Sequence, residues 1–131
     1  MRRVIFHAEV LAALALASVL IALLSFRRLA TLMAQARATT PVDAGTARRI
    51  DRALGRWSAR VPWRSMCFQQ GVAAQMLLRR RGREATVHYG AARDGAGNLV
   101  AHVWVRSGDV DVTGCVDVGR YGLLATFPPS R

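Results

Sequence analysis

The stretch Pro62-Trp63-Arg64-Ser65-Met66-Cys67-Phe68-Gln69-Gln70 decides how the rest of this chain is interpreted. Apolar residues recur at helical spacing from Gly71 to Leu78, and Arg79-Arg80-Arg81-Gly82 then supplies a helix-ending signal. The pattern predicts a helix from Cys67 to about Arg81, with the cysteine in its first turn. There the free backbone N–H groups and the positive end of the helix dipole favour a thiolate, which is the nucleophilic form of cysteine.

Length and composition favour one small domain. The chain has 131 residues, of which 52% are apolar, so it is long enough for a compact core and is not a disordered protein. Its 19 basic residues against 8 acidic ones give a formal charge of +11, which favours an acidic partner such as a peptide or an anionic lipid. Aromatic residues make up only 7% and no nucleic-acid-binding motif is present, which argues against nucleic acid.

The N-terminal part contains an apolar run from Val10 to Leu24, with arginines on both sides. A helix of that length spans about 22 Å, less than the ~30 Å hydrocarbon core of a bilayer. A membrane span and a cleavable signal peptide are alternatives, but we favour a helix that packs along the domain or lies in the membrane interface. The breaker cluster at Thr39-Thr40-Pro41 divides the chain into an apolar helix with its linker, residues 1–40, and a domain over residues 41–131.

The remaining periodicities predict an α+β fold. A helix is expected from Ala47 to about Ala59, with Ile50, Leu54 and Trp57 on one face. Alternating apolar residues then predict an antiparallel sheet with strands at residues 85–90, 99–106, 109–113 and 121–127.

A nucleophilic cysteine requires a base, and His102 in the strand Ala101-His102-Val103-Trp104-Val105 is the best candidate. Trp104 lies on the same strand face and would exclude water from the site. His7 and His88 are rivals: the first lies in the N-terminal segment, and the second is equally explained as a packed or solvent-facing residue. The alternative role for Cys67 is structural, in a disulfide with Cys115 in an oxidising compartment. The helix-mouth position favours a free thiol in a reducing cytoplasm instead.

A third group would orient the imidazole. If Ser107-Gly108 forms a two-residue hairpin turn, Trp104 faces Asp111 and His102 faces Thr113, so Asp111 becomes a diagonal neighbour of the histidine. Asp109 and Asp117 remain alternatives, as does a dyad that has no acid. For the oxyanion, the backbone N–H of Cys67 and the side-chain amide of Gln69 or Gln70 are candidates.

Several motifs occur together in a fixed order. They are Pro62-Trp63-Arg64 through Cys67, the helix ending in Arg79-Arg80-Arg81-Gly82, His88-Tyr89-Gly90, Ala101-His102-Val103-Trp104-Val105, and Arg120-Tyr121 before Phe127-Pro128. In this order they resemble the lasso-peptide leader peptidases, the transglutaminase-like cysteine peptidase half of the lasso maturation B protein. The resemblance runs from about Phe26 to the C-terminus.

The resemblance implies a papain-like or transglutaminase-like core in which Cys67 is the nucleophile and His102 the general acid and base. The sequence departs from the family pattern at the catalytic aspartate, which is expected near Thr113 or Gly114. Either Asp111 substitutes for it, or the chain works as a Cys–His dyad, or its activity is weakened. It implies a cysteine endopeptidase that removes the leader from a precursor peptide, with no cofactor and no metal. Its partners would be a separate leader-recognition protein and an ATP-dependent, asparagine-synthetase-like cyclase. The alternative is a catalytically silent scaffold that binds precursor and cyclase.

Overall fold

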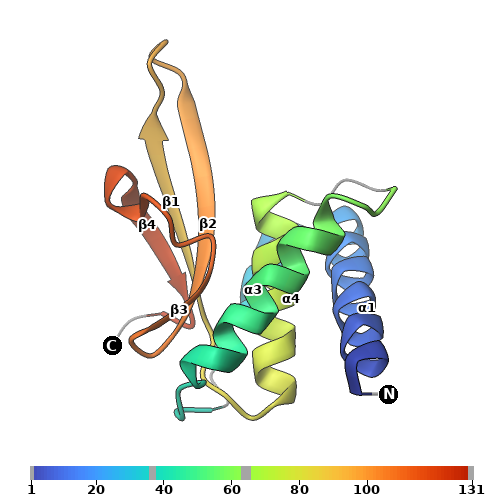
Figure 1. Cartoon of the computed structure of the whole chain (residues 1–131). Coiled ribbons are helices and arrows are strands. Elements are labelled where there is room, and N and C mark those ends of the chain that lie inside the picture. Colours follow the sequence, from blue (N-terminus) through green and yellow to red (C-terminus); the bar gives the residue numbers. More distant parts are fainter. Residues whose placement is uncertain (1, 36–37, 63–65, 130–131) are drawn as a thin grey trace.

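The computed structural model describes residues 2–35, 38–62 and 66–129, and Figure 1 shows the order of its elements. Trp63, Arg64 and Ser65 of the cysteine motif lie outside the described residues. The helices are α1 (Arg2–Leu23), α2 (Phe26–Met33), α3 (Ala44–Ser58) and α4 (Cys67–Arg80), followed late in the chain by the 3-10 helix η1 (Val118–Arg120). The strands are β1 (Thr86–Arg93), β2 (Leu99–Ser107), β3 (Val110–Thr113) and β4 (Gly122–Phe127).

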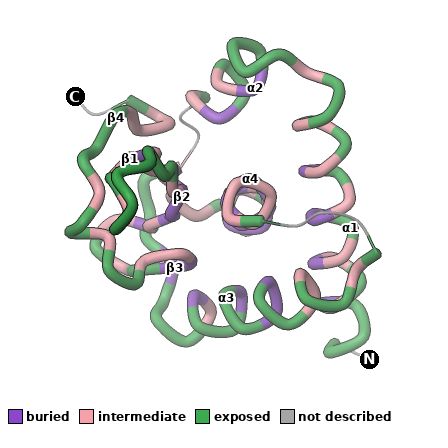
Figure 2. Tube along the Cα trace, turned by 90° about the horizontal axis from the view of Figure 1, so that it is seen from above, coloured by how far each residue is buried: buried purple, intermediate pink, exposed green. Residues whose placement is uncertain are grey.

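The fold is α+β, as predicted. The strands form one antiparallel sheet in the order β3-β2-β1-β4. Seen from above, α4 runs between the sheet and α1, while α2 and α3 close the two remaining sides (Figure 2). The helix that begins at the cysteine is therefore the centre of the molecule, and the other elements pack around it.

The central position of α4 follows from its small and aliphatic side chains. Val72, Ala73, Ala74, Leu77 and Leu78 are all buried. Because a helix packs most closely where its side chains are small, α4 can approach the sheet, and a Cβ at Gly71 would lie only 2.6 Å from Val103 Cγ1. The close approach at Gly71 also shows that the Val103 side chain of β2 faces α4.

Gln75 ties this helix to three other segments. Its side chain is 2% exposed, and its amide nitrogen donates to the backbone carbonyls of Met33 at 2.9 Å, Ala85 at 3.3 Å and Phe127 at 3.2 Å. A buried amide without partners would be costly, so these bonds fix the end of α2, the start of β1 and the end of β4 against α4.

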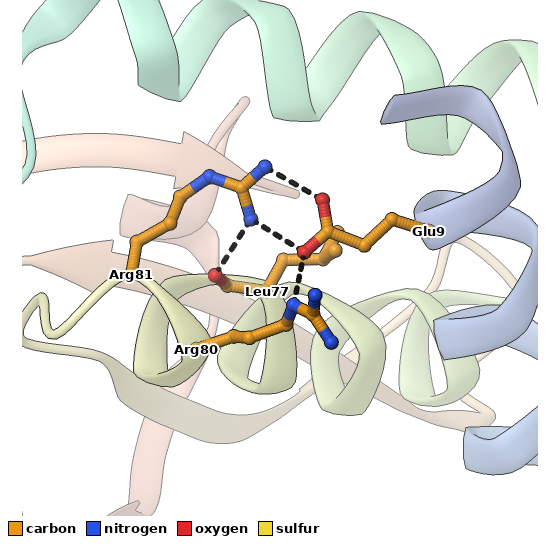
Figure 3. Close-up of polar contacts among 4 residues, drawn as sticks. All are labelled: Glu9, Leu77, Arg80 and Arg81. Carbon is orange, nitrogen blue, oxygen red and sulfur yellow. Dashed lines mark hydrogen bonds and ion pairs between the residues drawn. The ribbon is translucent and has the colours of Figure 1, made fainter. Parts of the chain in front are cut away.

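The N-terminal helix α1 contributes to the same core, in which Val10, Leu14 and Ala17 are fully buried. Glu9 of α1 binds two arginines at the C-terminal end of α4. Arg81 donates to both carboxylate oxygens of Glu9 at 2.7 and 3.0 Å, and Arg80 Nε lies 2.9 Å from one of them (Figure 3). By length and composition α1 could also cross a membrane. Side chains from before and after residues 40–41 pack in this one core. The division into two parts at these residues stays a prediction.

The predicted register of the β2–β3 hairpin is wrong. Gly108 takes a positive φ of 58°, as the first central residue of a two-residue turn with Asp109. The turn therefore lies one residue later than Ser107-Gly108, so Ser107 pairs with Val110 and Arg106 with Asp111. A register shift follows, and Thr113 faces Val105 instead of His102.

Candidate active site

Cys67 is the first residue of α4, as predicted. The helix start is closed by Gln69, whose Oε1 accepts from the backbone N–H of Met66 at 3.0 Å, and by the bond from Gln70 N to the Met66 carbonyl at 3.0 Å. The thiol is half-buried, free, and packed against the hydrophobic core. It therefore lies where first-turn N–H groups can stabilise an anion.

His102 lies near the middle of β2 on the sheet face that points away from α4. Its ring stacks on Tyr121 with a centroid separation of 4.9 Å and on Trp104 at 5.9 Å. Trp104 is only 6% exposed, so the aromatic wall predicted beside the histidine is present. The ring is half-buried among aromatic faces that limit its rotation.

A backbone carbonyl orients this ring. His102 Nε2 lies 2.7 Å from the carbonyl oxygen of Gly114. A carbonyl only accepts hydrogen bonds, so we assign the proton of the neutral ring to Nε2, which leaves the Nδ1 lone pair available to take a proton. In a catalytic cysteine–histidine pair, one ring nitrogen is likewise held by a hydrogen bond while the other accepts the proton of the thiol.

Gly114, near which the resemblance predicts an aspartate, lies where a side chain does not fit. Its φ is +71°, and a Cβ there would lie 2.7 Å from the Val103 carbonyl oxygen and 3.3 Å from Trp104 Cα. A side chain there would clash with the backbone of β2, which is paired on both sides with β1 and β3. In this conformation the residue presents its backbone carbonyl to His102.

Asp111 is engaged elsewhere. Its carboxylate accepts from Arg106 Nε at 2.8 Å on the exposed surface, and Arg106 also donates to the Asp109 backbone carbonyl at 3.0 Å. Asp117 has a positive φ of 57° just before η1. Among the described residues none of these three carboxylates is hydrogen-bonded to His102, so a catalytic role for Asp111 stays a prediction.

The rival histidines have structural partners. His7 Nδ1 accepts from Trp57 Nε1 at 2.9 Å, in the contact between α1 and α3. His88 stacks face to face on Trp104 at 5.5 Å, beside His102 on the same sheet face. Burial, and next the positive charge of Arg106, lower the pKa of His88 below its ordinary value of 6.5.

Cys115 has an environment unlike that of Cys67. Its Sγ donates to the carbonyls of Val105 at 3.3 Å and Thr113 at 3.4 Å, where the hairpin register shifts. Burial, and next the charge of Asp111, raise the pKa of this thiol, which favours its protonated, less nucleophilic form. Both cysteines are free in the structure, and no disulfide joins them.

The sequence itself supplies the family. Residues 10–126 match the family described as the transglutaminase-like superfamily. The chain belongs to this superfamily. No curated protein and no solved structure matches it. The match spans α1 to β4 and so includes both Cys67 and His102.

The two candidate residues of this transglutaminase-like domain, Cys67 and His102, lie on the neighbouring elements α4 and β2, but within the residues that the structure describes no hydrogen bond joins them. Val103 faces α4, so by alternation along β2 the adjacent His102 points to the opposite side. In the described part of the chain no hydrogen bond joins the Cys67 thiol to the His102 ring. The same part contains no group of three or more His, Cys, Asp or Glu residues that could hold a metal ion.

Sequence reasoning missed Gly114 and Tyr121 as neighbours of the histidine. A carbonyl carries no side-chain signature, so only the glycine itself, next to a strand end, hinted at an unusual backbone. Tyr121 lies at the start of the β4 segment, and its contact with His102 depends on the course of residues 114–121 across the outer face of the sheet, which local periodicity does not report.

Proposed function

We propose that this transglutaminase-like chain is a cysteine endopeptidase that removes the leader from a lasso-type precursor peptide, before a partner cyclase closes the macrolactam. The strongest support for this proposal is the local environment of Cys67 and of His102. Cys67 is a free thiol in the first turn of α4, and His102 is anchored through Nε2 with Nδ1 left as a proton acceptor. The motif resemblance adds the substrate class.

In the proposed reaction the Cys67 thiolate attacks the carbonyl carbon at the leader–core junction, after His102 has taken the thiol proton. The oxyanion forms beside the backbone N–H groups of the first turn of α4, which have no partner within the helix. His102 returns the proton to the departing amine of the core peptide, leaving the leader as a thioester on Cys67. Water, deprotonated by His102, then hydrolyses the thioester and restores the thiol.

The reaction requires the His102 ring to turn toward Cys67, because in the structure it points to the sheet face opposite α4. Catalytic hydrogen bonds are often long in free enzymes and shorten only when substrate is bound. We expect precursor binding to release the ring from its contacts with Gly114 and Tyr121 and to bring it to the cysteine. A separate leader-recognition protein would deliver the precursor, and the freed amine would pass to the cyclase, all on the cytoplasmic side of any membrane that α1 contacts.

One observation favours the alternative, a catalytically silent scaffold that binds precursor and cyclase. The His102 ring is already held by Gly114 and Tyr121, and no bond joins it to Cys67. If this arrangement persists with substrate bound, the chain would position other proteins without cutting.

Mass spectrometry separates the two functions. A short precursor and the cyclase are expected among neighbouring genes; the precursor and recognition protein are incubated with wild type, Cys67→Ala, His102→Ala and Cys115→Ala. We expect wild type and Cys115→Ala to release the core peptide, and Cys67→Ala and His102→Ala to fall by at least about a hundredfold. Equal cleavage by wild type and Cys67→Ala would exclude the peptidase, and intact precursor retained on wild type would establish the scaffold.

A further inference from the structure

A basic groove of about 580 Å³ lies between the N-terminal half of α1 and α3. Arginine is its dominant lining residue. The lining side chains are Arg3, Phe6 and His7 of α1 and Arg48, Arg49, Arg52, Ala53 and Arg56 of α3, together with Gly45. None of these described lining residues is acidic, so the groove concentrates positive charge.

The arginines of this groove differ from those at the end of α4. There Arg81 and Arg80 bind Glu9, whose carboxylate offsets part of their charge. Along α3, by contrast, no ion pair to a described carboxylate involves Arg48, Arg52 or Arg56, and all three are exposed. Their spacing of four residues aligns them on one helix face, where like charges repel. A bound anion would relieve that repulsion.

The walls of the groove are held in place by aromatic contacts. Arg49 lies over the Phe6 ring at 4.1 Å from its centroid, and Trp57 Nε1 donates to His7 Nδ1 at 2.9 Å. These contacts join α1 to α3. Phe6 is 6% exposed and covered by Arg49, so its ring offers little face on which a nucleotide base could stack.

The spacing of the row identifies the chemistry of the ligand. Residues four apart on a helix rise by about 6 Å, whereas side chains on one side of an extended peptide repeat every ~6.6 Å. We propose that the groove binds an acidic stretch of peptide in extended form, whose carboxylates at alternate positions pair with Arg48, Arg52 and Arg56. Guanidinium groups bind carboxylates with two parallel hydrogen bonds, which favours arginine for this task.

The proposal rests on the proposed function, because the substrate of a leader peptidase is itself a peptide. The row runs toward the C-terminal end of α3, which lies at the same end of the molecule as the start of α4 (Figure 1). A peptide bound along the row would therefore be directed toward the end of α4 that carries the nucleophile. The groove would select precursors that have an acidic segment on one side of the cleaved bond.

Fluorescence anisotropy tests the groove without requiring cleavage. A labelled peptide of alternating glutamate and alanine is titrated with the Cys67→Ala chain, and a glutamine–alanine peptide is the uncharged control. Replacing Arg48, Arg52 and Arg56 together by glutamine should raise the Kd at least about tenfold. The matched control replaces Arg27, Arg28 and Arg93, which removes the same charge elsewhere and should change the Kd less than about twofold.

Equal weakening by both triple variants would reduce the effect to net charge and overturn the proposal. A second arm uses vesicles of phosphatidylglycerol. If the groove variant loses vesicle binding while the acidic peptide never binds, the ligand is a lipid phosphate and the peptide proposal is wrong. Precursor cleavage by a chain whose groove does not bind acidic peptide would leave the proposed function standing and refute only the groove. Binding of the acidic peptide to the groove without any precursor cleavage would support the groove and refute the peptidase function.

Discussion

The two faces of the β-sheet use the same strand for different purposes. Toward α4, β2 presents Val103 and Val105, which are 3% and 0% exposed and pack in the aliphatic core. On the other face it presents His102 and Trp104, stacked with His88 and Tyr121. The inner face holds the sheet on the helix by apolar burial, whereas the outer face gathers titratable and aromatic groups. Changes on the inner face should therefore cost stability, and changes on the outer face should alter chemistry or pH response.

Gly114 contributes both to the packing of the sheet and to the position of His102, so replacing it should have the largest effect on stability and cleavage. Gly114→Ala forces a side chain into a positive φ and onto the Val103 carbonyl, so we expect a loss of about 2–4 kcal/mol from strain and overpacking. Precursor cleavage should fall as well, because the carbonyl that holds His102 moves. Denaturant unfolding measures the loss.

The control for this substitution is Gly97→Ala. Gly97 has a φ of +83° but nothing within 4 Å of a Cβ, so it should lose only the ~1–2 kcal/mol of the left-handed conformation. Equal losses at the two glycines would show that the close contact with β2 is not what makes Gly114 necessary.

Val105→Ala tests the inner face alone. Val105 is fully buried between the sheet and α4, and truncation should destabilise the domain by about 2–3 kcal/mol through lost burial and a residual cavity. The per-molecule cleavage rate should be unchanged while the chain is folded. Val100→Ala, at a position 38% exposed on the same strand, should cost less than about 1 kcal/mol in the same unfolding measurement.

His88 should give the outer face a pH-dependent stability. Its pKa is lowered in the folded chain, chiefly by burial, so below about pH 6.5 the unfolded chain binds the proton more readily and stability falls. Above that pH the residue is neutral in both states and has no effect. His88→Gln should flatten this part of the stability profile in unfolding experiments between about pH 7.5 and pH 5. An unchanged slope in the variant would assign the dependence to another group.

Asp111→Asn should have the smallest effect. The ion pair of Asp111 with Arg106 has exposed fractions of 65% and 38%, and such surface pairs contribute about 0–1 kcal/mol. Because the Gly114 carbonyl holds the histidine, cleavage should remain within about threefold of wild type. A loss comparable to that of His102→Ala would show instead that Asp111 reaches the histidine when substrate is bound.

The sequence by itself determined the elements and their chemistry. Helical periodicity after Cys67 predicted α4 with the cysteine in its first turn, and alternation predicted the strand that carries His102. Both follow from local backbone preferences and from the need to bury apolar side chains. Tertiary structure alone decided which groups meet the histidine. A turn displaced by one residue and a register shift moved Asp111 to Arg106, and a left-handed glycine brought a carbonyl to His102. Register and carbonyl direction depend on packing between distant segments, and that packing leaves no periodic signal in the chain.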